Sequence, residues 1–130
     1  MKILRKIPAL AVMTVSWILS SRSTVPMPDF KDSDKVVHVI CFAALAFCWT
    51  LWFSAESWWR HPVRNILIAV AIVSAYGIID EYHQSFVPGR DASVFDWAAD
   101  TIGAAIGSAA GYAAAVLSRK LRQRKRVTGR

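Results

Sequence analysis

The chain contains few acidic residues and few cysteines, and both shortages limit the classes of function that the sequence allows. Nine acids stand against sixteen lysines and arginines, which gives a formal net charge of +7. A basic excess raises nucleic acid as a partner. Seven of the basic residues, however, lie in an acid-free tail at 119–130 with no recognisable nucleic-acid reader beside it. We therefore expect no nucleic-acid binding.

The short motifs of familiar catalytic and cofactor sites are missing as well. The sequence has no nucleophile elbow, no glycine-rich phosphate loop and no cluster with metal-ligand spacing. The two cysteines, Cys41 and Cys48, would lie about 10 Å apart along a helix axis, which is too far for a disulfide. We accordingly expect no cofactor and no metal site.

What the chain has in abundance is apolar sequence, which makes up 55% of it. Apolar runs cover 7–19, 36–53, 65–79 and 93–117, and runs near 20 residues are typical of membrane spans. The sequence predicts an all-α fold, a bundle of four transmembrane helices in a single domain over 1–118, followed by a basic tail. The first run is short and could instead be a signal peptide, but no small-residue cleavage site follows it, so we favour a retained helix.

The distribution of lysine and arginine predicts the topology. The N-terminus, the second loop and the tail carry twelve of these residues, whereas the first and third loops carry four. Basic loops stay in the cytoplasm. We therefore expect both termini to be cytoplasmic and the protein to cross the cytoplasmic (inner) membrane several times.

The same topology gathers the unusual polar residues at the outward ends of three helices. An ionisable residue in a membrane span is a candidate for function. The functional polar cluster that we predict consists of Asp34, Lys35, His38, Asp80, Glu81, Gln84, Arg90, Asp96 and Asp100.

Some of these residues also have a purely structural explanation. Asp34 occupies an N-cap position, and Ser93 with Asp96 forms a capping-box pattern. Asp100 lies two turns into its helix and needs a partner such as Arg90, Lys35 or His38. Five acids against Lys35 and Arg90 give a local charge near −3, which suits protonated carboxyls, internal ion pairs or a bound cation better than a bare phosphate.

Glycine recurs every four residues in the last apolar run, at Gly103, Gly107 and Gly111. Stripes of small residues let helices approach closely in lipid. We expect this stripe to pack within the chain, although an interface between copies would have the same pattern.

Three motifs together resemble the VanZ-like family of small bacterial membrane proteins. They are Asp34-Lys35-x-x-His38 followed by Phe42, then Asp80-Glu81-x-x-Gln84-x-Phe86-x-Pro88-Gly89-Arg90, and Ser93-x-x-Asp96-x-x-x-Asp100-x-x-Gly103, and the resemblance covers 34–111. The family usually has Asn where Asp100 stands, so the site here holds one more acid. The family is named for a protein linked to resistance to teicoplanin, a lipoglycopeptide that acts at the cell envelope, so the resemblance implies an envelope role. Resistance does not follow from the resemblance alone.

Three hypotheses for function remain open. In the first, an outward polar pocket binds a cell-envelope component such as the head group of a membrane lipid or of a lipid-linked cell-wall precursor. In the alternative, the chain is an intramembrane enzyme that acts on such a precursor through its Asp, Glu and His residues. Proton-coupled transport is a third, which four helices would support only in an oligomer.

Overall fold

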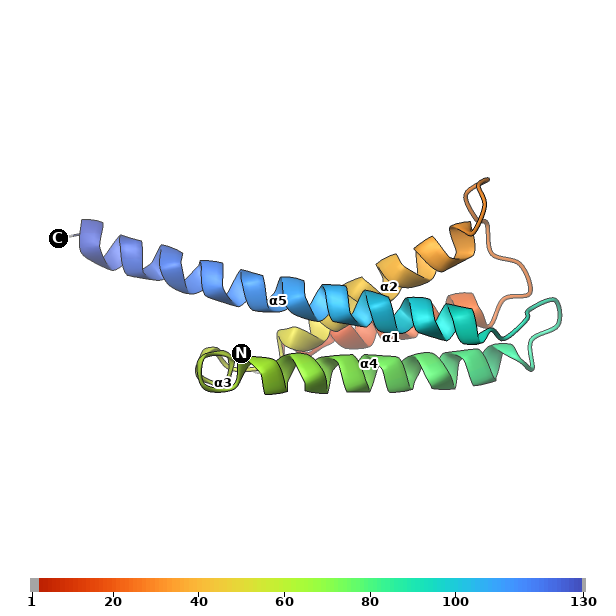
Figure 1. Cartoon of the computed structure of the whole chain (residues 1–130), viewed down its shortest axis with the longest axis horizontal. Helices are drawn as coiled ribbons and strands as arrows, with labels where there is room; N and C mark the ends of the chain where they lie inside the picture. Colours follow the sequence, from red (N-terminus) through yellow and green to blue (C-terminus); the bar gives the residue numbers. More distant parts are fainter. Residues whose placement is uncertain (1–2, 130) are drawn as a thin grey trace.

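A computed structural model describes residues 3–129, and within that range it contains five helices and no strand. The helices are α1 (Ile7–Ser20), α2 (Ser33–Thr50), α3 (Ala55–Arg60), α4 (Pro62–Gln84) and α5 (Val94–Thr128) (Figure 1). Three of them, α2, α4 and α5, are long and apolar enough to cross a membrane, and α1 is a shorter apolar helix. The all-α prediction is confirmed.

Helices α1, α2, α4 and α5 run roughly along the long axis of the molecule and give the bundle two distinct ends, whereas the short α3 is seen end-on (Figure 1). The connections 21–32 and 85–93 lie together at one end, which we call the ionisable end. The start of the chain, α3 and the C-terminal half of α5 lie toward the other, the basic end. The two ends of the described chain, near residues 3 and 129, therefore both lie toward the basic end, and the placement of the termini on the cytoplasmic side of the membrane stays a prediction.

The glycine stripe packs α5 closely against α2 within the chain. A Cβ atom at Gly103 would collide with the backbone carbonyl of Val39, and one at Gly107 with that of Ala43. A Cβ at Gly111 would collide with the Thr50 side chain. Contact at this distance leaves no room for a methyl group. The stripe therefore fixes the register between the two helices that carry most of the predicted site.

Helix α1 belongs to the same bundle. Ala9 is fully buried, and the Tyr76 hydroxyl of α4 donates a hydrogen bond of 3.0 Å to the backbone oxygen of Met13. Phe42, Leu45 and Val73 form the centre of the core that these helices enclose. The core lies between the two ends and holds both in place.

Several helix ends differ from the sequence prediction. Helix α5 continues past Leu117 to Thr128, because 118–128 contains strong helix formers and neither Pro nor Gly before Gly129. Helix α4 begins at Pro62, an N1 position that suits proline, and continues past Asp80 to Gln84. The short helix α3, capped by the Ser54 side chain, lies where only a loop was expected.

Candidate functional site

The deepest contact at the ionisable end joins α2 to α5. His38 Nδ1 and Asp100 Oδ1 form a hydrogen bond of 2.8 Å, in which the nitrogen donates when Asp100 is ionised. Asp100 is 0% exposed and His38 is 9% exposed. His38 is therefore the partner of Asp100, and the other two candidates from the sequence, Arg90 and Lys35, have other contacts. The other oxygen, Asp100 Oδ2, lies against Gly77 of α4, where an added Cβ would approach it to 2.9 Å.

Glu81 connects the last turns of α4 to the start of α5. Its Oε2 accepts a hydrogen bond of 2.8 Å from the backbone N–H of Ser93, the N-cap residue of α5. The Ser93 hydroxyl in turn accepts from the N–H of Phe95, so the predicted helix start is confirmed. The expected capping box is wrong, because the Ser93 hydroxyl accepts from Phe95 and not from Asp96, and because Glu81, not Asp96, accepts from the cap N–H. Asp96 is therefore free for another role.

Asp96 turns toward α2. Its Oδ1 lies 3.3 Å from Lys35 Nζ, an ion pair that lacks hydrogen-bond geometry, whereas Lys35 makes a shorter contact of 2.8 Å to its neighbour Asp34. Asp34 is half exposed and lies at the rim of the cluster. The N-cap interpretation of Asp34 is wrong, because α2 already begins at Ser33 and Asp34 lies inside its first turn. The N-cap residue is Asp32, which has a left-handed backbone and makes no capping hydrogen bond with its side chain.

A second chain of contacts runs from α4 to the loop before α5. Gln84 Nε2 donates to Asp80 Oδ2 at 2.9 Å, and Arg90 donates to Gln84 Oε1 from Nε at 3.2 Å and Nη2 at 2.7 Å. Gly89 has φ of 81°, and the Arg90 N–H donates to the carbonyl of Val87. This is a tight turn with glycine at its third position, and it positions the arginine over the helix end.

Carboxylate oxygens at this end are buried without partners. Among residues 3–129, Asp80 Oδ1, Glu81 Oε1 and Asp100 Oδ2 accept no hydrogen bond, although their residues are 2%, 7% and 0% exposed. A buried acceptor without a partner costs about 1–3 kcal/mol, and more when it is charged. Such atoms call for a proton, a cation or a ligand that donates hydrogen bonds.

Three residues also satisfy the proximity that a metal ion requires. His38, Glu81 and Asp100 each offer a ligand atom, and these atoms lie within 4.8 Å of one another. Tetrahedral ligands at about 2.0–2.2 Å from an ion lie roughly 3.4 Å apart, so a small inward movement would close the site. The residues come from three helices, so no local spacing motif in the sequence indicates them.

Two features of this end were missed or misjudged from the sequence. Gly77 provides the space that Asp100 occupies, but a single glycine in an apolar run gives no signal of that role. His83, which gave no signal in the sequence either, stacks on Trp17 of α1 with ring centroids 4.0 Å apart. His83 therefore contributes to helix packing at this end.

The large cavity and the buried ionisable residues lie at different ends of the molecule. A cavity of about 820 Å³ lies at the basic end, lined by α3 and by parts of α2 and α5. We place the candidate site at the ionisable end nevertheless, because buried ionisable groups in a membrane span mark function more specifically than open space does.

The comparisons with known proteins agree with this architecture. A family model described as VanZ/LLP1 matches residues 3–116, a range that holds α1 to α4, most of α5 and the whole polar cluster. No curated protein and no solved structure matches the chain. With its apolar helices, the chain is a multi-pass membrane protein, and it belongs to the VanZ/LLP1 family.

Proposed function

We propose that the ionisable end of the bundle binds the polar head group of a cell-envelope component, a lipid or a lipid-linked cell-wall precursor, on the outward side of the inner membrane. The observation that supports this most strongly is the set of buried carboxylate oxygens without partners on Asp80, Glu81 and Asp100. A protein that folds in lipid keeps such atoms only where something pairs with them.

The chemistry of these residues indicates what kind of head group fits. The inner carboxylates of Asp80, Glu81 and Asp100 accept hydrogen bonds, so they suit hydroxyl or amino donors. Lys35, partly exposed at the rim, and Arg90, half-buried at the same end, carry the positive charge that suits a phosphate. A lipid-linked precursor has both chemistries in one molecule, with a phosphate next to donor-rich sugar or peptide groups. Binding of this kind would relate the chain to resistance against teicoplanin-type glycopeptides.

Arg90→Ala tests this proposal. Arg90 is anchored by Gln84 with its other donors free for a ligand, and one charged hydrogen bond contributes roughly tenfold or more to binding. We expect native mass spectrometry of the purified protein to show at least tenfold less co-purified precursor lipid than in the parent.

Lys31→Ala is the matched control, because Lys31 is an exposed cation in the other loop at the same end. It should retain the lipid of the parent. Unchanged lipid in Arg90→Ala at normal expression, or equal loss in both variants, would count against a binding site at this end.

A second candidate function is hydrolysis of such a precursor within the membrane, and the proximity of His38, Glu81 and Asp100 favours it. A divalent cation held there would lower the pKa of a bound water. The attack of that water on a phosphorus or carbonyl atom would break the bond to the leaving oxygen or nitrogen, and a base would take the water's proton and pass it to that leaving group. Because His38, Glu81 and Asp100 would be the ligands, a carboxylate outside that set, such as Asp96 or Asp80, would serve as that base.

Head-group binding and hydrolysis can be distinguished by measuring bound metal and turnover. Under the hydrolysis hypothesis, the purified protein contains a stoichiometric metal by elemental analysis, and a chelator abolishes product release. Exchanging both Asp96 and Asp100 for Asn should then abolish turnover, and retained function in that double variant would eliminate the enzyme.

A further inference from the structure

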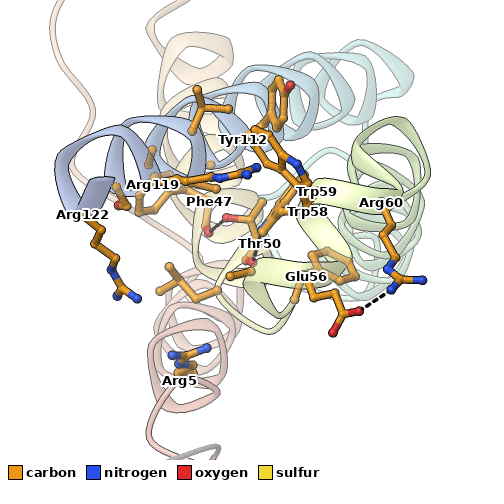
Figure 2. A pocket seen from close by; sticks show the side chains of 18 of the residues that line it. Arg5, Phe47, Thr50, Glu56, Trp58, Trp59, Arg60, Tyr112, Arg119 and Arg122 are labelled. Carbon is orange, nitrogen blue, oxygen red and sulfur yellow. Dashed lines mark hydrogen bonds and ion pairs between the residues drawn. The ribbon is translucent and has the colours of Figure 1, made fainter. Parts of the chain in front are cut away.

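The cavity at the basic end has no part in the function proposed above. It measures about 820 Å³ and opens between the end of α2, helix α3 and the C-terminal half of α5 (Figure 2). Arg5, which precedes α1, lines it from the side opposite α5. Four separate segments of the chain thus enclose one space at the end of the bundle away from the acids.

The charge around this cavity is strongly one-sided. Five arginines line it: Arg5, Arg60, Arg119, Arg122 and Arg126. Among the lining residues that the structure describes, Glu56 is the one acid, and it pairs with Arg60 at 2.9 Å. The other four arginines form no ion pair within residues 3–129. The cavity therefore has uncompensated positive charge.

The arginines of α5 share one face of that helix. Arg119, Arg122 and Arg126 are spaced three and four residues apart, so their side chains project from the same side. Lys120 and Arg124 project from roughly the other side. Over 119–128 the basic tail is thus the continuation of α5, and it presents three guanidinium groups to the cavity.

Aromatic rings and apolar groups complete the lining. The Arg119 guanidinium lies 3.3 Å from the centre of the exposed Trp59 ring, a cation–π contact that holds the arginine in place (Figure 2). Phe47, Leu51 and Val116 line the part nearer the bundle. The space is therefore apolar toward the membrane core and basic toward its end, which is the polarity of a phospholipid.

We propose that this cavity binds the head group of an anionic phospholipid, with the phosphate at Arg119 and Arg122 and an acyl chain along Phe47 and Val116. Charge complementarity decides the occupant, because a zwitterionic lipid would leave the unpaired arginines without a counter-charge. By the distribution of basic residues this end faces the cytoplasm, where anionic lipids attract basic segments of membrane proteins.

Lipid titration of the purified full-length chain in detergent tests the proposal. Native mass spectrometry should show bound phosphatidylglycerol at concentrations where phosphatidylcholine does not bind. Each arginine near an anionic surface contributes roughly fivefold to binding, so Arg119→Ala with Arg122→Ala should weaken phosphatidylglycerol binding roughly 25-fold. Inorganic phosphate is the second probe, and we expect it neither to bind nor to raise the melting temperature.

The matched control removes the same charge from the other face, as Lys120→Ala with Arg124→Ala. It should bind phosphatidylglycerol within about twofold of the parent. Equal weakening in both double variants would show general charge attraction and overturn a defined site. Stabilisation by inorganic phosphate equal to that by the lipid would identify a free anion as the occupant, and would overturn the proposal too.

A gentler variant keeps the proposal testable if the double substitution unfolds the protein. Arg119→Lys retains the charge but loses the planar group that lies over Trp59, so it should weaken phosphatidylglycerol binding while leaving the lipid-free melting temperature unchanged. Equal affinity for the parent and Arg119→Lys would contradict the assigned position of the phosphate. Arg90→Ala should not alter this binding, so failure here and failure at the ionisable end are distinguishable.

Discussion

The two ends of this bundle hold opposite charges in opposite environments. At the ionisable end, acids outnumber fixed cations, and His38, Asp80 and Asp100 are buried between helices. At the basic end, arginines dominate and Arg119 and Arg122 are exposed. Buried charges need specific partners, whereas exposed ones are screened by water and salt. The ionisable end is therefore suited to selective chemistry, and the basic end to recognition by charge.

Both ends depend on the same piece of packing. Helices α2 and α5 each carry residues of the polar cluster at one end and residues of the basic cavity at the other, and the glycine stripe sets the distance between them. Local sequence determines the charge of each end, while this contact determines whether its residues meet. A substitution can therefore disrupt both ends together, or one end alone.

The largest effect is expected from Gly107→Leu, which would disrupt both ends. The new side chain would collide with the backbone of Ala43, which cannot move aside as a flexible side chain could. We expect a loss of more than about 4 kcal/mol of unfolding free energy, measured by steric trapping or by denaturation in mixed micelles. Ala109→Leu, on an exposed position of the same helix, is the control and should change little.

The sequence predicted most of this architecture because its strongest signals are local. Apolar runs identified the helices, and counting Lys and Arg sorted the connections between two sides. Placing Asp80, Glu81, Asp96 and Asp100 on that topology was enough to bring them to one end. The tight turn at Gly89 also followed from local preference, since its φ of 81° suits glycine.

What could not be predicted depends on contacts between distant residues. His38 and Asp100 are separated by 62 positions, and their pairing follows from the register that the glycine stripe imposes. The cavity at the basic end requires α5 to continue as a helix past Leu117, although hydropathy ends there. Charged residues such as Arg119 and Lys120 are good helix formers, so a hydropathy criterion underestimated the helix.

The next largest effect should be confined to the ionisable end. His38→Leu leaves Asp100 buried without its partner, and breaking a buried pair destabilises by about 3 kcal/mol. The double variant with Asp100→Leu removes both polar groups and should recover much of that loss. A double-mutant cycle of thermal unfolding measures the coupling, and strictly additive losses would show that the two residues do not act as a pair.

The smallest effect is expected at the basic end, and it sharpens the contrast. Glu56 and Arg60 form an ion pair of 2.9 Å, nearly as short as that of His38 with Asp100, but their side chains are 72% and 70% exposed. An exposed pair at this helical spacing contributes about 0.3–0.5 kcal/mol. Glu56→Gln should therefore change the melting temperature by a degree or two at most, and less in high salt. Because it also frees Arg60 beside the cavity, phosphatidylglycerol should bind at least as tightly as before. A loss comparable to that of His38→Leu would mean that burial does not distinguish the two ends.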